Sequence, residues 1–163
     1  MISSAMEVLG KDGVVAFPTD TLYGIATRIT SVKGYRRIYD IKGREQSKPV
    51  AICFASFEQL VRWMPHLTGY PVINALLPGP VTIVLPRTDE IPPHVNPLCD
   101  WIGVRIPDNL LAQQLSAEEP LCLTSANKSG QSSAITANDF AGLHDRLDIV
   151  VDGGRIDDSK QSR

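Results

Sequence analysis

The chain has 163 residues, 43% of them hydrophobic and 21% charged, and its formal net charge at pH 7 is −2. This length is enough for one globular domain with a hydrophobic core, and a slightly acidic chain is unlike proteins that bind nucleic acid through overall positive charge. No apolar run reaches the roughly 20 residues of a membrane-spanning helix, and the first residues lack a signal- or transit-peptide pattern. Three cysteines without a CxxC pair and three scattered histidines predict free thiols and no zinc site. We therefore predict a cytoplasmic protein without a membrane span, and a mitochondrial location stays open.

The chain opens with signals for a short helix and a buried strand. Ser3 or Ser4 is the expected helix cap, and an apolar run over residues 13–17 predicts the strand. The strand runs into PTDTLYG (residues 18–24), where hydroxyl and carboxylate side chains follow one another. This segment is expected to be a loop that holds a small polar ligand, or an ordinary turn in which Asp20 bonds to the backbone.

A helix, a strand and a second helix are predicted next. Ser31 is the expected N-cap of the first helix, and Gly43 ends it. The apolar run at residues 50–54 is typical of a strand covered on both faces. Ser56 then caps a helix whose apolar residues recur every three or four positions over residues 57–64, a pattern that indicates core packing.

The middle of the chain predicts a short helix and three strands. The helix covers residues 72–77, and strands at residues 81–85 and 101–106 are separated by a proline-rich loop. Asp108 is the expected cap of another helix, and residues 121–123 form the third strand.

The last predicted elements are a helix that begins at Thr136, a strand at residues 149–151 and a polar tail at residues 157–163. Strands alternate with helices, and no internal repeat or linker is visible. We therefore predict a single α/β domain over residues 1–156, built on a twisted, mixed, open sheet that is flanked by helices.

Two segments carry groups that suit phosphate oxygens. Residues 33–48 contain six basic and two acidic side chains, and Lys42, Arg44 and Lys48 lie between a predicted helix and a predicted strand. A cluster of hydroxyl and amide groups follows residues 121–123 and consists of Ser125, Asn127, Ser129, Ser132 and Ser133. A solvated basic face and an ordinary surface loop are the alternative interpretations.

Arg105 lies between apolar neighbours near the end of a predicted strand. A partly buried guanidinium needs an anion, which is either a substrate carboxylate or an internal partner such as Asp100 or Asp108. The chain has neither a Ser-His-Asp pattern nor a P-loop, so no covalent nucleophile is expected.

Six motifs, in this order and spacing, resemble the YrdC-type threonylcarbamoyl-AMP synthase family, and most closely its eukaryotic members. The motifs are PTDTLYG (18–24), KGREQSKP (42–49), LPGPVTIVL (77–85), GVRIP (103–107), TSANKSG (124–130) and VDGG (151–154). Together they span most of the chain, which makes the set more specific than any one motif.

The resemblance implies a nucleotidyltransferase with a YrdC-like fold. In that family L-threonine and bicarbonate give a carbamate, which attacks the α-phosphate of ATP and expels pyrophosphate. The product, L-threonylcarbamoyladenylate, passes to a downstream tRNA threonylcarbamoyl transferase complex that forms tRNA threonylcarbamoyladenosine. Such a reaction can proceed through positioning and charge neutralisation alone.

The resemblance also implies the binding residues. For threonine these are Thr21, Tyr23, Arg105 and the backbone near Leu123. For the ATP phosphates they are Lys42, Arg44, Lys48, Ser125, Asn127 and Ser133. Mg²⁺ is expected to arrive with the nucleotide, and no metal site is expected in the protein.

The chain departs from the family pattern at two places. Many bacterial relatives have a histidine four residues after the proline matched by Pro49, where this chain has Cys53, whose thiol is a weaker hydrogen-bond partner. The family also continues after VDGG into a further strand and an arginine. We therefore expect the C-terminal part of the family domain to be missing here, with a thinner ATP site and an uncovered sheet edge.

Two alternative functions stay open at this point. YrdC-like domains are also associated with double-stranded RNA, and the basic window at residues 33–48 could contact RNA or tRNA without synthase activity. Carbamoyl transfer in hydrogenase maturation is a third option, although that activity normally belongs to much longer chains.

Overall fold

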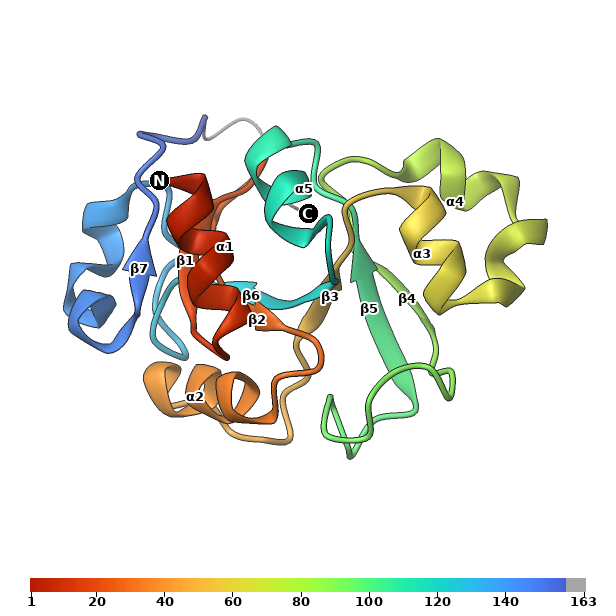
Figure 1. The fold of residues 1–163 in the computed structure, drawn as a ribbon, viewed down its shortest axis with the longest axis horizontal. Helices are drawn as coiled ribbons and strands as arrows, with labels where there is room; N and C mark the ends of the chain where they lie inside the picture. The colour runs from red at the N-terminus through yellow and green to blue at the C-terminus, as the bar shows by residue number, and fades with distance from the viewer. Residues whose placement is uncertain (158–163) are drawn as a thin grey trace.

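A computed structural model describes residues 1–157 of the chain (Figure 1). Its strands are β1 (Val15–Pro18), β2 (Tyr23–Arg28), β3 (Ala51–Cys53), β4 (Ile83–Pro86), β5 (Trp101–Arg105), β6 (Leu121–Ser125) and β7 (Ile149–Val150). Its α-helices are α1 (Ile2–Gly10), α2 (Val32–Lys42), α3 (Phe57–Trp63), α4 (Pro71–Leu76) and α5 (Leu110–Ser116), and its 3₁₀ helices are η1 (Pro65–Gly69) and η2 (Ala137–Arg146).

In the described part of the chain, the strands form one seven-stranded sheet in the order β4-β5-β3-β6-β2-β1-β7. The pairs β3–β5 and β1–β7 are parallel, and the other neighbours are antiparallel. The prediction of a single α/β domain around a mixed open sheet is therefore confirmed. The boundary at residue 156 stays a prediction, and the predicted tail beyond Asp157 lies outside the described residues.

Helices cover both faces of the sheet. On one face α1 and α5 pack over β1 and β6, and Figure 1 shows both helices in front of the central strands. On the other face α2 and η2 pack over β1 and β2. The short helices α3, η1 and α4 pack over β3 and β5 and form a third apolar cluster with them. The sheet is thus the middle layer of three, and β3 is buried on both faces, as the apolar run at residues 50–54 predicted.

Two helix starts and one helix end were predicted correctly. The Ser31 hydroxyl accepts a hydrogen bond from Gly34 N at 2.9 Å, and the Ser56 hydroxyl accepts one from Gln59 N at 3.1 Å. Gly43 ends α2 with φ of 58°, a left-handed conformation in which glycine is the least strained residue.

Two predicted helix caps are wrong. Ser3 and Ser4 lie inside α1, which begins after Met1. Asn109, not Asp108, caps α5, and its Oδ1 accepts from Ala112 N at 3.0 Å. Two polar residues stand side by side there, and sequence alone does not fix which of them occupies the cap. Thr136 does precede a helix, but that helix is the 3₁₀ segment η2, which is interrupted at Phe140.

The sequence interpretation missed β2, a strand inside the sheet. It placed PTDTLYG wholly in a loop, whereas only residues 19–22 form the turn and Tyr23 already pairs with Pro18. β2 is rich in small residues because its neighbours approach closely: a Cβ on Gly24 would lie 2.5 Å from Leu123 Cδ1. Buried Thr27 donates to Gly13 O at 2.9 Å. Such a strand lacks the β-branched apolar pattern used to recognise the others.

Two further observations concern membrane helices and cysteines. Within residues 1–157, no helix is long and apolar enough to cross a membrane. Cys53, Cys99 and Cys122 are free thiols, and Cys53 and Cys122 are buried in the core, where each packs as a small apolar side chain.

The contact between α2 and β2 gives a test of the packing. A Cβ on Gly34 would collide with the Thr27 side chain, lying 2.8 Å from Thr27 Cβ. Gly34→Ala is expected to lower the free energy of unfolding by about 1–3 kcal/mol, as overpacked core sites do. The measurement is urea unfolding of the wild type and the variant. Gly142→Ala is the matched control, since a Cβ there meets nothing within 4 Å. Equal loss in both variants would contradict the predicted packing.

Candidate active site

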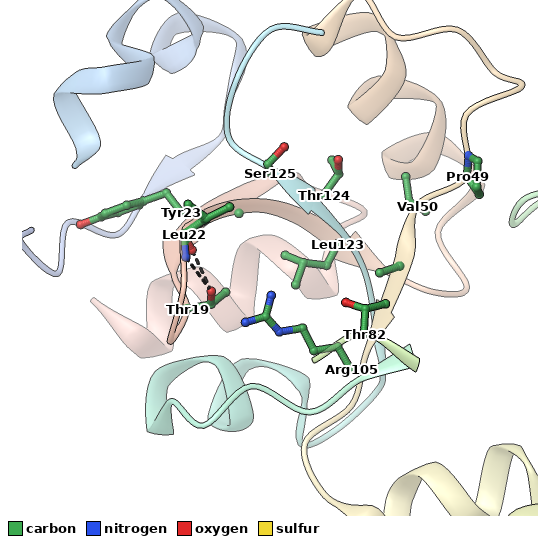
Figure 2. A pocket seen from close by; sticks show the side chains of 12 residues that line it. Thr19, Leu22, Tyr23, Pro49, Val50, Thr82, Arg105, Leu123, Thr124 and Ser125 are labelled. Carbon is green, nitrogen blue, oxygen red and sulfur yellow. Dashed lines mark hydrogen bonds between the residues drawn. The ribbon is translucent and has the colours of Figure 1, made fainter. Parts of the chain in front are cut away.

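A cleft of about 250 Å³ opens on the sheet face that carries Arg105 (Figure 2). Its lining comes from the β1–β2 turn, the start of β2, β3, β5, β6 and the segments before β3 and β4. The lining residues are Thr19, Leu22, Tyr23, Gly24, Pro49, Val50, Ala51, Thr82, Arg105, Leu123, Thr124 and Ser125. Four of the predicted site residues, Tyr23, Arg105, Leu123 and Ser125, thus meet at one cleft.

Small residues leave room for this cleft. Ala51 on β3 pairs with Gly103 on β5, and on the other side of β6 Gly24 of β2 pairs with Ser125. A Cβ on Gly103 would lie 3.1 Å from Thr82 Cγ2. Larger side chains at these positions would fill the space that Leu123 and Thr82 line.

Thr19 fixes the conformation of the β1–β2 turn. Its hydroxyl oxygen accepts from the backbone N–H groups of Thr21 and Leu22, both at 3.2 Å, and donates to Leu22 O at 2.8 Å. Figure 2 shows these bonds between Thr19 and Leu22 at the cleft wall. The alternative in which Asp20 bonds to the backbone is therefore wrong, and the Asp20 carboxylate is free to bond elsewhere.

Arg105 forms a buried ion pair with Asp20. Its Nη2 lies 2.5 Å from Asp20 Oδ1 and 2.7 Å from Thr21 Oγ1. The residue is only 8% exposed. The sequence interpretation named Asp100 or Asp108 as internal partners, and the structure replaces both with Asp20. That partner could not be identified from spacing, because it lies on a turn 85 residues earlier in the chain.

The ion pair is only half satisfied. Asp20 Oδ2 and Arg105 Nε are buried and have no hydrogen-bond partner among the described residues. Nη1 of Arg105 likewise makes no hydrogen bond within residues 1–157, since only Nη2 donates. A guanidinium with free donors beside a cleft can pair with a carboxylate in the planar, two-bond geometry that arginine favours. The arrangement suits a small molecule with a carboxylate group.

Tyr23 is a lining residue of the cleft, but its ring packs against Phe140 in the apolar cluster under α2 and η2, with ring centroids 5.5 Å apart. The hydroxyl donates to Gly154 O at 2.7 Å and lies 3.1 Å from Asp152 Oδ1, and it accepts from Gly153 N at 3.0 Å. Figure 2 shows the Tyr23 hydroxyl pointing away from Arg105. Tyr23 thus joins the sheet to the VDGG segment, and burial raises the pKa of its hydroxyl.

Lys42 is the last residue of α2 rather than a loop residue, and it is 2% exposed. Its Nζ donates to the Ser125 carbonyl and, at 2.7 Å, to the Asn127 carbonyl, with Asn127 Oδ1 at 3.4 Å. Burial lowers the pKa of Lys42 to about 8, and the positive charge of Arg44 acts in the same direction. The ammonium group therefore holds the segment after β6 in place.

Of the predicted phosphate-binding residues, Ser125 lines the cleft, and Lys42, Arg44, Lys48, Asn127 and Ser133 lie outside its lining. Arg44 is tied to its own loop, where Nε donates to Lys48 O at 3.2 Å and Nη2 donates to Pro49 O at 2.8 Å. Lys48 and Ser133 are exposed. The structure therefore brings Lys42, Ser125 and Asn127 together, while the contacts of the other three give no evidence on phosphate binding.

Cys53 lies on β3 next to Arg105 on β5, with which it is in register. It is fully buried and does not line the cleft. Burial raises the pKa of its thiol to about 12, so the group is a neutral thiol at physiological pH. Cys53 thus packs behind the Arg105 side chain.

Several cleft residues were not singled out from the sequence. Thr19 was visible in PTDTLYG, but nothing in the spacing distinguished it from Thr21 as the residue facing the cleft. Thr82 and Ala51 reach the cleft only through the pairing of β4 with β5 and of β5 with β3. The available signal was a small residue in each of three strands, at Gly24, Ala51 and Gly103. Glycine within a strand often marks a place where another group approaches closely.

The comparisons with known proteins agree with the motifs. The family model for Sua5, YciO and YrdC proteins, described as "Telomere recombination", matches residues 7–163. A Homo sapiens protein named threonylcarbamoyl-AMP synthase is 38% identical over 161 residues, which cover 98% of this chain and 58% of that protein. A Methanocaldococcus jannaschii protein named putative threonylcarbamoyl-AMP synthase is 37% identical, over 91% of this chain and 72% of that protein.

A solved structure supports the same relationship. Sua5 from P. abyssi, crystallised with L-threonine, superposes with a TM-score of 0.86 and 32% identity, over 94% of this chain and 47% of that chain. The present chain therefore spans little more than half the length of its mammalian relatives and about half of this structural one. The ordered motifs, the mixed sheet and the family match over residues 7–163 together show that the chain belongs to the Sua5/YciO/YrdC family.

Proposed function

We propose that this chain is a threonylcarbamoyl-AMP synthase, which forms L-threonylcarbamoyladenylate and pyrophosphate from L-threonine, bicarbonate and ATP. The observation that carries the proposal is Arg105, whose unpartnered donors lie beside a cleft lined by small residues and hydroxyl groups. The names of the relatives and the threonine-bound Sua5 structure support the same assignment.

On the threonine side, the proposal assigns the substrate carboxylate to Arg105. The bond from Arg105 to Thr21 holds the guanidinium in one orientation, and the Thr19 hydroxyl lines the same cleft. The proposal assigns the amino end of the substrate to the backbone near Leu123, where β6 lines the cleft. With the carboxylate on Arg105, the threonine nitrogen lies away from the guanidinium. The amine is then available to react with bicarbonate.

On the ATP side, the proposal assigns the triphosphate to the rim near Ser125 and Asn127. Lys42 holds this rim by its bonds to the carbonyl groups of both residues. Arg44, Lys48 and Ser133 are proposed to approach the phosphates when nucleotide binds. Mg²⁺ is proposed to enter on the phosphates of ATP, which neutralises part of their charge.

The proposed chemistry needs positioning more than covalent catalysis. The threonine amine and bicarbonate combine to a carbamate with loss of water. A carbamate oxygen then forms a bond to the α-phosphorus as the bond to the bridging oxygen breaks, and that electron pair leaves with pyrophosphate. Holding the two reactants in line and screening their negative charges can supply most of the acceleration.

The RNA-binding alternative is less favoured, because the human and M. jannaschii relatives are both named for the synthase. Transfer of the product to a downstream tRNA-modifying complex, and any direct contact with tRNA, belong to the proposal alone. The deciding experiment measures pyrophosphate release from ATP with and without threonine and bicarbonate. Release that requires both supports the proposal. No release, together with salt-sensitive RNA binding by the same preparation, would replace it with the RNA-binding module.

The threonine assignment predicts a selective defect when the Arg105 charge is removed. Arg105→Gln combined with Asp20→Asn keeps the buried pair neutral, since removing only one charged partner costs about 3–5 kcal/mol. The double variant is expected to bind threonine at least about tenfold more weakly, because a charged hydrogen bond contributes about 1.5–3 kcal/mol. ATP affinity should stay within about twofold in the same calorimetric measurement.

Arg62→Gln provides the control for that comparison, because within residues 1–157 Arg62 pairs only with exposed Glu58 on α3. It should leave the affinities for both substrates unchanged. An equal loss of threonine and ATP affinity in the double variant would contradict the assignment of Arg105 to threonine.

The nucleotide assignment predicts a pH dependence through Lys42. At pH 7 Lys42→Met is expected to weaken binding of a non-hydrolysable ATP analogue by about tenfold, through lost charge and a looser rim. Because the pKa of Lys42 is lowered to about 8, its positive charge is present below that pH and is lost above it. The difference between wild type and variant should therefore shrink as the pH rises through 8. Lys128→Met, an exposed lysine near Asn127, is the control. A difference that stays constant from pH 7 to pH 9 would refute this role.

A further inference from the structure

A second pocket of about 210 Å³ lies between α2 and the loop before β5, and it shares no lining residue with the cleft. Its lining consists of Val32, Tyr35, Arg36, Tyr39, Gln46, His94 and Pro97. We call it the α2 pocket. None of these residues has a role in the synthase site proposed above.

Hydrogen bonds hold the walls of the α2 pocket. The hydroxyls of Tyr35 and Tyr39 lie 2.9 Å apart, and Tyr35 OH donates to Asn96 Oδ1 at 3.2 Å. Arg87 fixes the loop on the other side by donating to the carbonyls of Ile91, Pro92, Val95 and Asn96. A ligand entering a pocket with such fixed walls loses little free energy to ordering the protein.

The electrostatics of the α2 pocket favour an anion. None of its seven lining residues is acidic, and Arg36 is exposed and makes no hydrogen bond or ion pair with the described residues. His94 Nε2 is buried without a hydrogen-bond partner in the same part of the chain. Burial lowers the pKa of His94, and the nearby Arg87 and Arg36 lower it further, against a hydrogen bond to the Ile29 backbone. The positive charge of Arg36 thus stands at this pocket without a counterion among the seven lining residues.

The lining of the α2 pocket also includes aromatic and apolar groups, of which Tyr35 and Tyr39 are 7% and 3% exposed. Tyr35 and Tyr39 have ring centroids 5.1 Å apart, and the His94 ring meets Tyr35 edge-on at 5.5 Å. Val32 and Pro97 add apolar surface at the mouth. Aromatic rings pack well on such tilted faces. A small inorganic anion would leave this surface unused.

We propose that the α2 pocket binds a small planar aromatic carboxylate, with the carboxylate on Arg36 and the ring against Tyr35 and Tyr39. The Gln46 amide at the rim can donate a second hydrogen bond to the carboxylate. The proposal does not depend on the synthase reaction, because the α2 pocket and the cleft have separate linings.

The test is a titration of the full chain with benzoate, followed by NMR at the tyrosine and histidine signals. Benzoate should give saturable shifts at Tyr35, Tyr39 and His94 and should raise the pKa of His94, because the bound anion offsets the charges of Arg36 and Arg87. The signals of His66 and His144 serve as internal references. Benzamide, cyclohexanecarboxylate and inorganic phosphate should each bind more weakly, since benzamide lacks the charge and the other two lack the flat ring.

Arg36→Gln should weaken benzoate binding at least about tenfold, because it removes a charge-assisted pair. The variant should fold normally, since Arg36 has no partner to lose among the described residues. Arg62→Gln removes the same charge from an exposed ion pair on α3 and should leave benzoate binding unchanged. Absence of saturable shifts at these residues, equal binding of benzamide or phosphate, or full benzoate binding by Arg36→Gln would each overturn the proposal.

Discussion

The site depends on the buried ion pair between Arg105 and Asp20. It joins the end of β5 to the β1–β2 turn, across 85 positions of sequence. A guanidinium that is 8% exposed needs an anion nearby, and the turn can supply one because the Thr19 hydroxyl closes the turn in place of Asp20. The pair still leaves Arg105 Nε and Asp20 Oδ2 without partners in the described part of the chain. One contact therefore joins two distant segments and also leaves hydrogen-bonding capacity beside the cleft.

The sheet order explains why the motifs converge. β2 lies between β1 and β6, so the turn before it and the segment after β6 come to the same end of the sheet. Lys42 extends this arrangement from the other face, because it reaches from the end of α2 to the carbonyls of Ser125 and Asn127. Strand pairing and the Lys42 hydrogen bonds thus connect the PTDTLYG, KGREQSKP and TSANKSG motifs to one another. The Tyr23 hydroxyl connects the VDGG segment to them through its bond to Gly154 O.

The sequence predicted the elements with strong periodicity or caps, and it failed where long-range pairing decides. Ser31, Gly43 and Ser56 mark helix boundaries by local chemistry, and the structure confirms all three. β2 was missed because close packing against Leu123 requires Gly24 and other small residues, which carry no strand pattern.

The importance of Arg105 was visible from its apolar neighbours, whereas its partner Asp20 was not. Lys42 was assigned to phosphate, and only the fold shows that its ammonium group already donates to two carbonyl oxygens.

The central claim is that the cleft recognises the carboxylate of an amino acid through Arg105. Calorimetric titration of the chain with L-threonine and with L-threoninol, which has an alcohol in place of the carboxylate, tests it most directly. We expect saturable binding of L-threonine and an affinity for L-threoninol that is at least about tenfold lower, because the charged hydrogen bonds to the guanidinium are gone. Equal affinity for the two compounds would contradict it.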